Sequence, residues 1–387
     1  PFGTGPVTFA NNSGLAGKGD AMAVVPNAVL AQQGLIWIGA YAPVTLSGGW
    51  TASGDTVYGK ASSNEVTVAG SMQPSSSNKS RLVIYDGSVR FASGANALFT
   101  HPSTRNSIDF SSPASASSVR KLTIETGAQV TAGCLYEGCG ASNTVAVSGG
   151  SLVLQGAVGY GDALVFGAGA LSTNRFELSG GQVTAADNMW NMLGVDPGVS
   201  VFRVAAGTAS FGKVSFGVRD WPNNDVGALP FDARLTIDGG LFEARQRWNW
   251  MGEMDGMRVN TVELNGGRLR LPATISIVPN RINQTRLVFN GGTLETPGGG
   301  TDPEDPANYL KGLKQATVGA GGAVIDTQGR SVTLAQRLTA LGGVTDGGLV
   351  KRGLGTLTLS KPPCVTGRID VQSGTLRLQS ETGAAYP

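Results

Sequence analysis

Aromatic residues recur along the chain at nearly regular intervals of roughly 24 to 31 residues, within the range of repeat architectures. The series is Tyr136, Tyr160, Trp190, Trp221 and Trp248, with Trp250 beside the last. Acidic residues accompany it, namely Glu137, Asp162, Asp187, Asp196, Asp220, Asp225, Glu253 and Asp255. Flat rings stack on the faces of sugars and carboxylates accept hydrogen bonds from sugar hydroxyls, so this combination is typical of carbohydrate binding.

If the interval is one structural repeat, these side chains project from one flank of the protein as a ladder. The predicted glycan-binding residues are Tyr160, Trp190, Trp221, Trp248, Trp250, Asp220 and Asp255. The alternative is structural, because the same side chains would also fill space beneath long loops. The methionines of the same segments favour that alternative; they are Met189, Met192, Met251, Met254 and Met257.

Carboxylate pairs in these segments raise a catalytic alternative, since glycoside hydrolysis uses two carboxyl groups about 5 to 10 Å apart. Asp220 with Asp255, or Asp225 with Glu253, would meet if they lie on neighbouring repeats. Every repeat offers some acid, however, and no arginine is singled out as the base of a polysaccharide lyase. We therefore predict a protein without catalytic activity, with a polysaccharide lyase or a glycoside hydrolase as the alternative.

Few other residues could carry chemistry. His101 is the only histidine, and nothing near it resembles a nucleophile motif, so we expect an exposed loop residue. Cys134 and Cys139 could close a small disulfide loop or be two buried thiols, and Cys364 stands apart. Because this set of ligands does not suit a transition metal, we predict no metal and no cofactor.

The elements that position these residues are copies of one unit: a short alternating strand, a glycine corner and a second strand. The copies are RLVIYDGSVRF (81–91), KLTIETGAQVTA (121–132), TVAVSGGSLVL (144–154), RFELSGGQVTA (175–185), RLTIDGGLFEA (234–244), TVELNGGRLRL (261–271) and RLVFNGGTLET (286–296). The second glycine of the later copies falls at Gly150, Gly181, Gly240, Gly267 and Gly292, and a degenerate copy stands at Gly207. One corner therefore occurs roughly every 30 residues, a period typical of repeat architectures.

This spacing predicts an all-β fold, a β-solenoid in which each pass of the chain forms one rung. Glycine takes positive φ without penalty, so the chain turns at the corner. One corner cannot bury its own apolar face, whereas rungs stacked about 4.8 Å apart can. A β-sandwich also uses short, regularly spaced strands, but it does not repeat the same residues at the same turn.

The last repeats carry a likeness to a known family. GGLVKRGLGTLTLS (347–360) followed by GRIDVQSGTLRL (367–378) resembles the passenger-associated transport repeat, also called the autotransporter-associated β-strand repeat. The matching positions are Gly348, Leu349, Lys351, Gly353, Gly355, Thr356, Leu357 and Leu359. The chain departs from the family pattern between the two strands, where KPPCVTG replaces the expected loop, and at Gln372-Ser373-Gly374.

The resemblance implies a right-handed parallel β-helix in a large exported bacterial protein, whose repeats are scaffold without catalytic residues. Residues 347–378 are the best repeat match, and we expect residues 1–387 to form a single elongated solenoid of roughly a dozen rungs. We also expect the chain to be part of a longer exported protein.

The composition agrees with an exported β-rich protein. The chain has 58 glycines, about twice the usual share. Charged residues make up 14%, well below the usual share. The net charge is +2 without a basic block, so no nucleic-acid partner is expected. The most apolar stretch, 21–44, is interrupted by Pro26 and Gly34, so no membrane span is expected.

We therefore predict a secreted or cell-surface structural or adhesive scaffold, with a carbohydrate-binding adhesin as the alternative. The expected partners are further copies of the chain, assembled end to end or laterally, or a surface polysaccharide.

Overall fold

The fold is that of a computed structural model, which describes residues 2–17, 22–39, 42–75, 79–100, 107–110, 118–138, 142–156, 161–168, 172–195, 198–217, 231–250, 258–272, 274–277, 284–297 and 309–379. Within these ranges every regular element is a β-strand, which confirms the predicted all-β class. The described part of the chain accordingly contains no helix that is long and apolar enough to cross a membrane.

The chain divides into two compact units, Pro1–Ser200 and Val201–Pro387. The strands of the first unit are β1 (Val7–Phe9), β2 (Ser13–Leu15), β3 (Ala23–Val25), β4 (Val29–Ala31), β5 (Gly34–Ile38), β6 (Val44–Leu46), β7 (Trp50–Ala52), β8 (Thr56–Val68), β9 (Ser71–Pro74), β10 (Ser80–Phe91), β11 (Asn96–Phe99), β12 (Ile108–Asp109), β13 (Val119–Glu125), β14 (Gln129–Ala132), β15 (Leu135–Gly138), β16 (Ser142–Leu154), β17 (Asp162–Ala168), β18 (Ser172–Ala185) and β19 (Trp190–Leu193).

β20 (Gly198–Phe216) begins at the end of the first unit and continues into the second. The strands that follow it are β21 (Phe231–Ile237), β22 (Leu241–Trp250), β23 (Arg258–Leu264), β24 (Arg268–Arg270), β25 (Thr274–Ile277), β26 (Gln284–Phe289), β27 (Thr293–Glu295), β28 (Gln315–Val318), β29 (Ala323–Asp326), β30 (Val332–Leu334), β31 (Thr339–Ala340), β32 (Leu349–Arg352), β33 (Thr356–Leu359), β34 (Ile369–Val371) and β35 (Thr375–Leu378).

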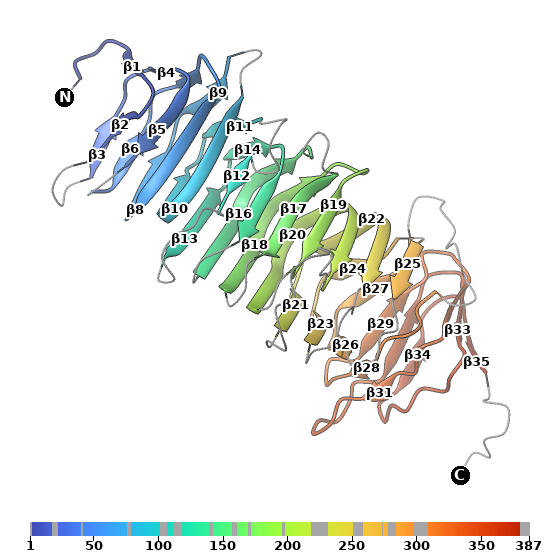
Figure 1. Cartoon of the computed structure of the whole chain (residues 1–387). Helices are drawn as coiled ribbons and strands as arrows, with labels where there is room; N and C mark the ends of the chain where they lie inside the picture. The colour runs from blue at the N-terminus through green and yellow to red at the C-terminus, as the bar shows by residue number, and fades with distance from the viewer. Residues whose placement is uncertain are drawn as a thin grey trace. The chain divides into compact units, whose positions relative to one another are not determined.

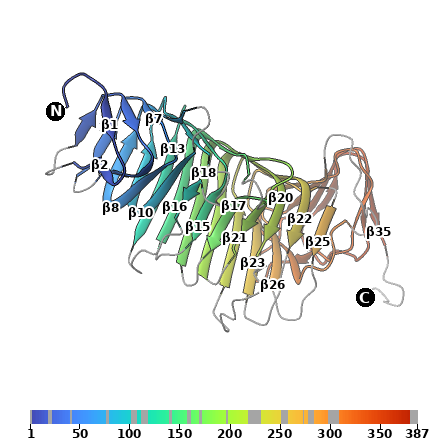
Figure 2. The same cartoon turned by 45° about the horizontal axis from the view of Figure 1, so that its top comes forward.

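The strands pair in parallel, and each pairs with a strand one repeat further along the chain. In the first unit Ser151 of β16 lies opposite Gln182 of β18, a sequence separation of 31. In the second unit Ser210 lies opposite Glu243, at a separation of 33, and Glu243 lies opposite Arg270, at a separation of 27. The corner glycines of the same repeats have the same spacings, so the repeat length sets the register. Figures 1 and 2 show the strands of each unit side by side, each next to the strand one repeat further along the chain.

Long strands of the first unit pass around the corner between two faces. The first half of β16 pairs with β13 and its second half with β14, so one strand contributes to both faces. β20 passes the corner at Gly207 in the same way, whereas the next corner separates two strands, because β21 ends at Ile237 and β22 begins at Leu241.

Glycine is required at these corners for two reasons. Gly181 and Gly240 have φ angles of 73° and 66°, in the region that side chains rarely adopt. A Cβ on Gly181 would also collide with the carbonyl oxygen of Gly150, and one on Gly240 with that of Gly207. The glycines therefore stack on one another from repeat to repeat.

The core consists of columns of inward side chains. Strand alternation points every second residue inward, and parallel register places these residues above their counterparts in the preceding repeat. One column of the first unit runs through the buried side chains of Leu82, Ile108, Leu135 and Leu164. The same register explains the repeated Gly-Thr-Leu-x-Leu, since Leu357 and Leu359 of β33 lie opposite Leu376 and Leu378 of β35.

Candidate functional site

Two of the predicted glycan-binding residues lie in the core, which corrects the expectation of an exposed aromatic ladder. Trp248 and Trp250 are fully buried on β22, with ring centroids 5.8 Å apart, and Trp248 also packs on Phe242 at 6.0 Å. Being two residues apart on a strand, they point to the same, inward face. They therefore offer no surface on which a sugar could stack.

Trp190, at the start of β19, is half-buried and is the one predicted glycan residue whose exposure permits contact within the described part of the chain. Four others lie outside the described residues, namely Tyr160, Trp221, Asp220 and Asp255. So do Asp225, Glu253 and His101, so both predicted carboxylate pairs and the expected exposure of the histidine stay predictions.

Cys134 is buried, whereas Cys139 lies outside the described residues, so the predicted disulfide stays a prediction. Cys134 packs with Val165 and Val195, and Tyr136 and Met192 lie against this cluster. Here an aromatic residue of the periodic series and a methionine fill space beside the core. This contact supports the structural interpretation of the series.

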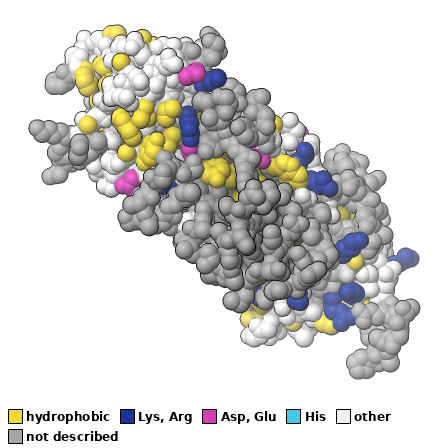
Figure 3. Space-filling view, in the orientation of Figure 1, with side chains coloured by type: hydrophobic (Ala, Val, Ile, Leu, Met, Phe, Trp, Pro, Cys, Tyr) yellow, Lys and Arg dark blue, Asp and Glu magenta, His cyan; other side chains and the backbone are white. Residues whose placement is uncertain are grey.

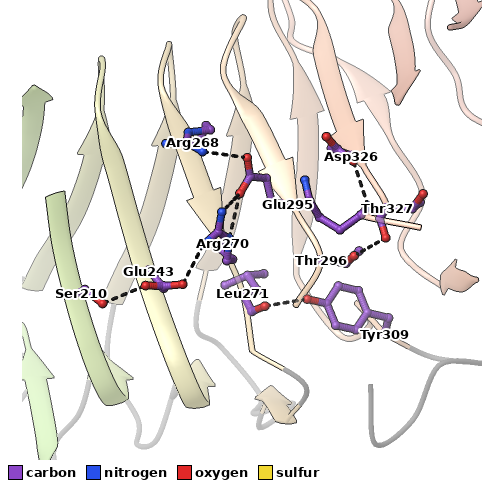
Figure 4. A network of polar contacts seen from close by, with 11 residues as sticks. Ser210, Glu243, Arg268, Arg270, Leu271, Glu295, Thr296, Tyr309, Asp326 and Thr327 are labelled. Carbon is purple, nitrogen blue, oxygen red and sulfur yellow. Dashed lines mark hydrogen bonds and ion pairs between the residues drawn. The ribbon is translucent and has the colours of Figure 1, made fainter. Parts of the chain in front are cut away.

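A ladder of charged side chains crosses the second unit on one face (Figure 4). Ser210, Glu243, Arg270 and Glu295 occupy four successive strands in direct register. Arg270 Nη1 lies 2.9 Å from Glu243 Oε1, and its Nη2 lies 2.8 Å from Glu295 Oε2. The hydroxyl of Ser210 donates to the other oxygen of Glu243 at 2.8 Å. Adjacent repeats are thus joined by charge-assisted hydrogen bonds.

Arg270 bridges the two carboxylates of this ladder, and their geometry does not suit acid–base catalysis. Glu295 is nearly buried and receives Arg270 on one oxygen and Arg268, at 3.5 Å, on the other. A general acid must reach the atom to which it transfers its proton, and both oxygens of Glu295 are already engaged by arginine. The arrangement connects strands and leaves no acid poised for transfer.

A second ladder follows the glycine corners of the second unit. The guanidinium of Arg203 donates to Asp238 at 2.6 Å, and the Asn265 amide donates to the same carboxylate at 2.9 Å. Asn290 donates to Asn265 at 3.4 Å and accepts the backbone N–H of Gly321 at 2.9 Å. The Asp or Asn before each glycine pair therefore has a structural task, because it links one corner to the next.

Lys351 is a buried cation in an otherwise apolar column. Its register partner on β29 is Ile325, yet its ammonium group reaches the neighbouring corner. The Nζ atom donates to the carbonyl oxygens of Arg352 and Gly353, each at 2.7 Å, and of Ser373 at 3.2 Å. It also donates to Thr327 Oγ1 at 3.1 Å. Burial lowers the pKa of Lys351, and these oxygens stabilise its charged form.

Lys60 repeats this arrangement in the first unit. It is fully buried opposite Ile84, and its Nζ donates to Ser62 Oγ at 2.9 Å and to the Asp86 carbonyl at 3.3 Å. It also donates to the carbonyl of Ser62, two residues further on, as Lys351 does to Gly353. Burial lowers the pKa of Lys60 to about 8, and nearby Asp86 opposes the shift.

Asp346 fastens the corner before β32. Its carboxylate accepts the N–H and the hydroxyl of Thr366, both at 2.7 Å, and the N–H groups of Gly367 at 2.8 Å and Gly348 at 3.0 Å. The hydrogen bonds from Thr366, side chain first and backbone next, lower the pKa of Asp346 to about 2. The carboxylate therefore joins two repeats that are 20 residues apart in sequence.

Glu137 is a buried acid without such support. It lies on β15 opposite the buried Phe166. On the other side of β15, the carbonyl of the preceding residue, Tyr136, accepts the N–H of the buried Phe110, so Glu137 has apolar neighbours on both sides. Neither carboxyl oxygen of Glu137 has a hydrogen-bond partner among the described residues. Desolvation by burial raises the pKa of Glu137 well above its ordinary value of 4.5, so the neutral acid is favoured.

The sequence analysis placed Glu137 among the acids of the aromatic series and Lys351 among the repeat-matching positions. It did not expect either side chain to be buried, although strand alternation contains the signal. In Leu349-Val350-Lys351 the lysine falls at the same inward phase as the buried leucine, and in Leu135-Tyr136-Glu137 the acid does so. Charged residues are rarely buried unless they are paired, so such positions are informative.

Comparison of the chain with protein-family models, with curated proteins and with solved structures found no match. The likeness to the autotransporter-associated repeat therefore rests on the residues of 347–378 alone.

Proposed function

We propose that the chain is an extracellular structural scaffold that coils as a right-handed parallel β-helix. The parallel register carries this proposal, because partners separated by one repeat length continue from strand to strand within each unit. A stack of this kind gains stiffness from backbone ladders and side-chain columns without a cofactor. The handedness and the export to a bacterial surface rest on the repeat resemblance of residues 347–378.

The contacts of polar side chains support a structural role over a catalytic one. Glu243 and Glu295 are held by arginine, Asp346 by backbone N–H groups, Lys60 by the carbonyl of Asp86 and Lys351 by that of Ser373. Each of these contacts joins neighbouring repeats, so its loss would weaken the stack.

The test is incubation of the purified full chain with neutral and acidic polysaccharides, scoring retention and soluble product together. A scaffold yields no product from any polymer. Product that disappears in Glu243→Gln or Glu295→Gln would overturn the proposal and make the ladder a catalytic site.

Two tryptophan variants separate scaffold from adhesin in the same assay. Trp248→Ala should lower stability because it empties a buried site, with no specific effect on retention. If the chain retains a polysaccharide and Trp190→Ala abolishes retention while preserving the fold, glycan adhesion replaces rigidity as the function.

A further inference from the structure

One outward face of the first unit carries a pair of aromatic side chains. Trp37 stands between the buried Ile36 and Ile38 of β5, so strand alternation points it outward. Tyr85 follows the buried Ile84 of β10, and its ring centroid lies 5.6 Å from that of Trp37, so the two rings share this face. Both side chains are half-buried. We call the two rings the aromatic platform.

The indole ring of Trp37 lies above a glycine. Gly59 of β8 is the register partner of Trp37, and a Cβ there would lie 2.9 Å from Cε3 and 3.0 Å from Cζ3 of the indole. The ring therefore occupies the space that a side chain at position 59 would fill. Because Trp37 is nevertheless only half-buried, part of the indole surface stays open to solvent. An accessible ring supported by the sheet in this way is a surface on which a ligand can stack.

The strands around the platform present further apolar side chains outward. Leu35 of β5 and Val57 of β8 are half-buried register partners on this face. On the visible face of the molecule, hydrophobic side chains gather in the region of β5 to β10 (Figure 3). The platform therefore has apolar neighbours on β5 and β8.

The charged side chains of the same face already have counter-charges. Arg81 of β10 forms an ion pair with the buried Asp109 of β12 and is itself 24% exposed. Asp86, the residue after Tyr85, is close enough to the ammonium of Lys60 to oppose the lowering of its pKa. A ligand on the platform therefore meets no uncompensated charge, which favours a neutral ligand over an acidic or basic polymer.

Accessible Trp and Tyr side chains are confined to this face in the described part of the first unit. Tyr136 of β15 and Trp190 of β19 are the other two that are half-buried, and both point outward from strands that continue the sheet beyond β10. Another face of the same unit is polar, because β18 presents Arg175 and Glu177 outward there. The aromatic side chains thus gather where one extended ligand could contact several of them.

We propose that the aromatic platform binds a neutral polysaccharide, a role beyond that of the scaffold. Sugar rings would stack on the accessible surfaces of Trp37 and Tyr85. The guanidinium of Arg81, oriented by Asp109, would donate hydrogen bonds to sugar hydroxyls. The polymer would cross the strands, which lie about 4.8 Å apart, in the direction of Tyr136. An extended peptide is a poorer fit, because β5, β8 and β10 are each paired on both sides and offer no backbone edge.

The test uses the full chain and fluorescently labelled hexasaccharides of three neutral polymers, a β-glucan, a mannan and a galactan, with binding followed by fluorescence anisotropy. A hexasaccharide of galacturonic acid is the charged control. We expect one of the neutral probes to bind with little dependence on salt, and the acidic probe to bind at least tenfold more weakly. Trp37→Ala and Tyr85→Ala should each weaken binding at least tenfold, whereas Tyr85→Phe keeps the ring and should bind like the wild type.

The matched control variant is Arg175→Glu, which changes an exposed side chain on the polar face. It should bind like the wild type, and circular dichroism should show the variants folded. If Trp37→Ala does not fold, the pair Tyr85→Ala and Tyr85→Phe carries the test. Absence of binding by every neutral probe, or tighter binding of the acidic probe, would overturn the ligand class, and unchanged binding by the alanine variants would overturn the location. The scaffold proposal is tested separately, by the release of soluble product.

Discussion

Lys351 in the second unit and Glu137 in the first occupy the same kind of position with opposite consequences. Both are fully buried at inward positions of strands. The ammonium of Lys351 has four oxygen acceptors, whereas the carboxyl of Glu137 has no hydrogen-bond partner among the described residues. A flexible four-carbon stem lets lysine reach a corner, where carbonyl oxygens are available because the strands end.

The comparison indicates which charges a stack of parallel strands can bury. Ladder pairing uses the N–H groups along a strand, so an acid in the middle of a column finds no donor. Lys60 reaches corner oxygens in the first unit as Lys351 does in the second. Asp346 is held by N–H donors because it lies at a corner itself. Interior cations therefore help to join the repeats, whereas the buried carboxyl of Glu137 has no hydrogen-bond partner among the described residues.

Replacing Lys351 should have the largest effect. Lys351→Met keeps the apolar stem but removes the donor to the carbonyl oxygens of Gly353 and Ser373, so we expect a loss of about 4 kcal/mol in the free energy of unfolding. Urea unfolding followed by circular dichroism measures it. Arg352→Met, one residue further on and exposed, is the matched control and should lie within about 0.5 kcal/mol of the wild type.

Replacing Glu137 should raise the free energy of unfolding near neutral pH, whereas replacing Lys351 lowers it. The folded-state pKa lies above the unfolded value of 4.5, so the wild type is fully stable below pH 4.5 and loses stability as the pH rises towards the folded-state pKa. Relative to Glu137→Gln, this loss is about 1.4 kcal/mol per pH unit. Urea unfolding at pH 5, 6 and 7 measures the difference.

Glu177→Gln is the control for that series, because Glu177 pairs with Arg175 at the surface. It reports the effect of the same substitution at a surface carboxyl over the same pH range. A difference that does not change with pH for Glu137→Gln would show that Glu137 ionises in the folded protein as it does in the unfolded one.

Asp346 is a buried acid with hydrogen-bond donors, so its effect on stability should depend on pH in the opposite direction to that of Glu137. Its pKa of about 2 lies below the ordinary 3.8, so its contribution is present above pH 3.8 and is lost as the pH falls through about 2. Asp346→Asn should lower the melting temperature at pH 6, and the two proteins should converge near pH 2. A gap of the same size at both pH values would contradict a role for the charge.

The hydrogen bonds that link Asp238, Asn265 and Asn290 at the glycine corners should contribute least to the free energy of unfolding. Asn265→Ala removes the hydrogen bonds to Asp238 and from Asn290, which lie at the surface, and we expect a loss of about 1 kcal/mol. Thermal unfolding measures it. Gln182→Ala, which removes a single exposed contact to Ser151, should lose less.

Much of the fold followed from the sequence, because repetition in a chain of this kind sets its register. The glycine spacing predicted which residues pair, and the duplicated Gly-Thr-Leu-x-Leu predicted the β33–β35 contact. The aromatic series was interpreted less well. Trp248 and Trp250 recur at the repeat length because core columns recur at that length, so periodicity alone does not distinguish an exposed flank from the interior.

The surroundings of the buried charged residues were harder to predict, because they depend on contacts between repeats. The ammonium group of Lys351 contacts the carbonyl of Ser373, 22 residues later in the sequence. The repeat motif that residues 347–378 resemble includes a lysine at this position, but a motif does not indicate which distant carbonyl the lysine contacts. The isolation of Glu137 depends on its neighbours in two other repeats. Such contacts come from stacking, which local sequence does not contain.

The central claim is that repeats stack in parallel register one repeat length apart. Deleting residues 238–264 removes one full repeat and joins Ile237 to Asn265, which follows its register partner Leu264. Deleting residues 238–250 removes about half a repeat and breaks the register. We would measure urea unfolding of both variants by circular dichroism. A cooperative transition for the first and none for the second is the predicted result, and loss of folding in both would contradict the claim.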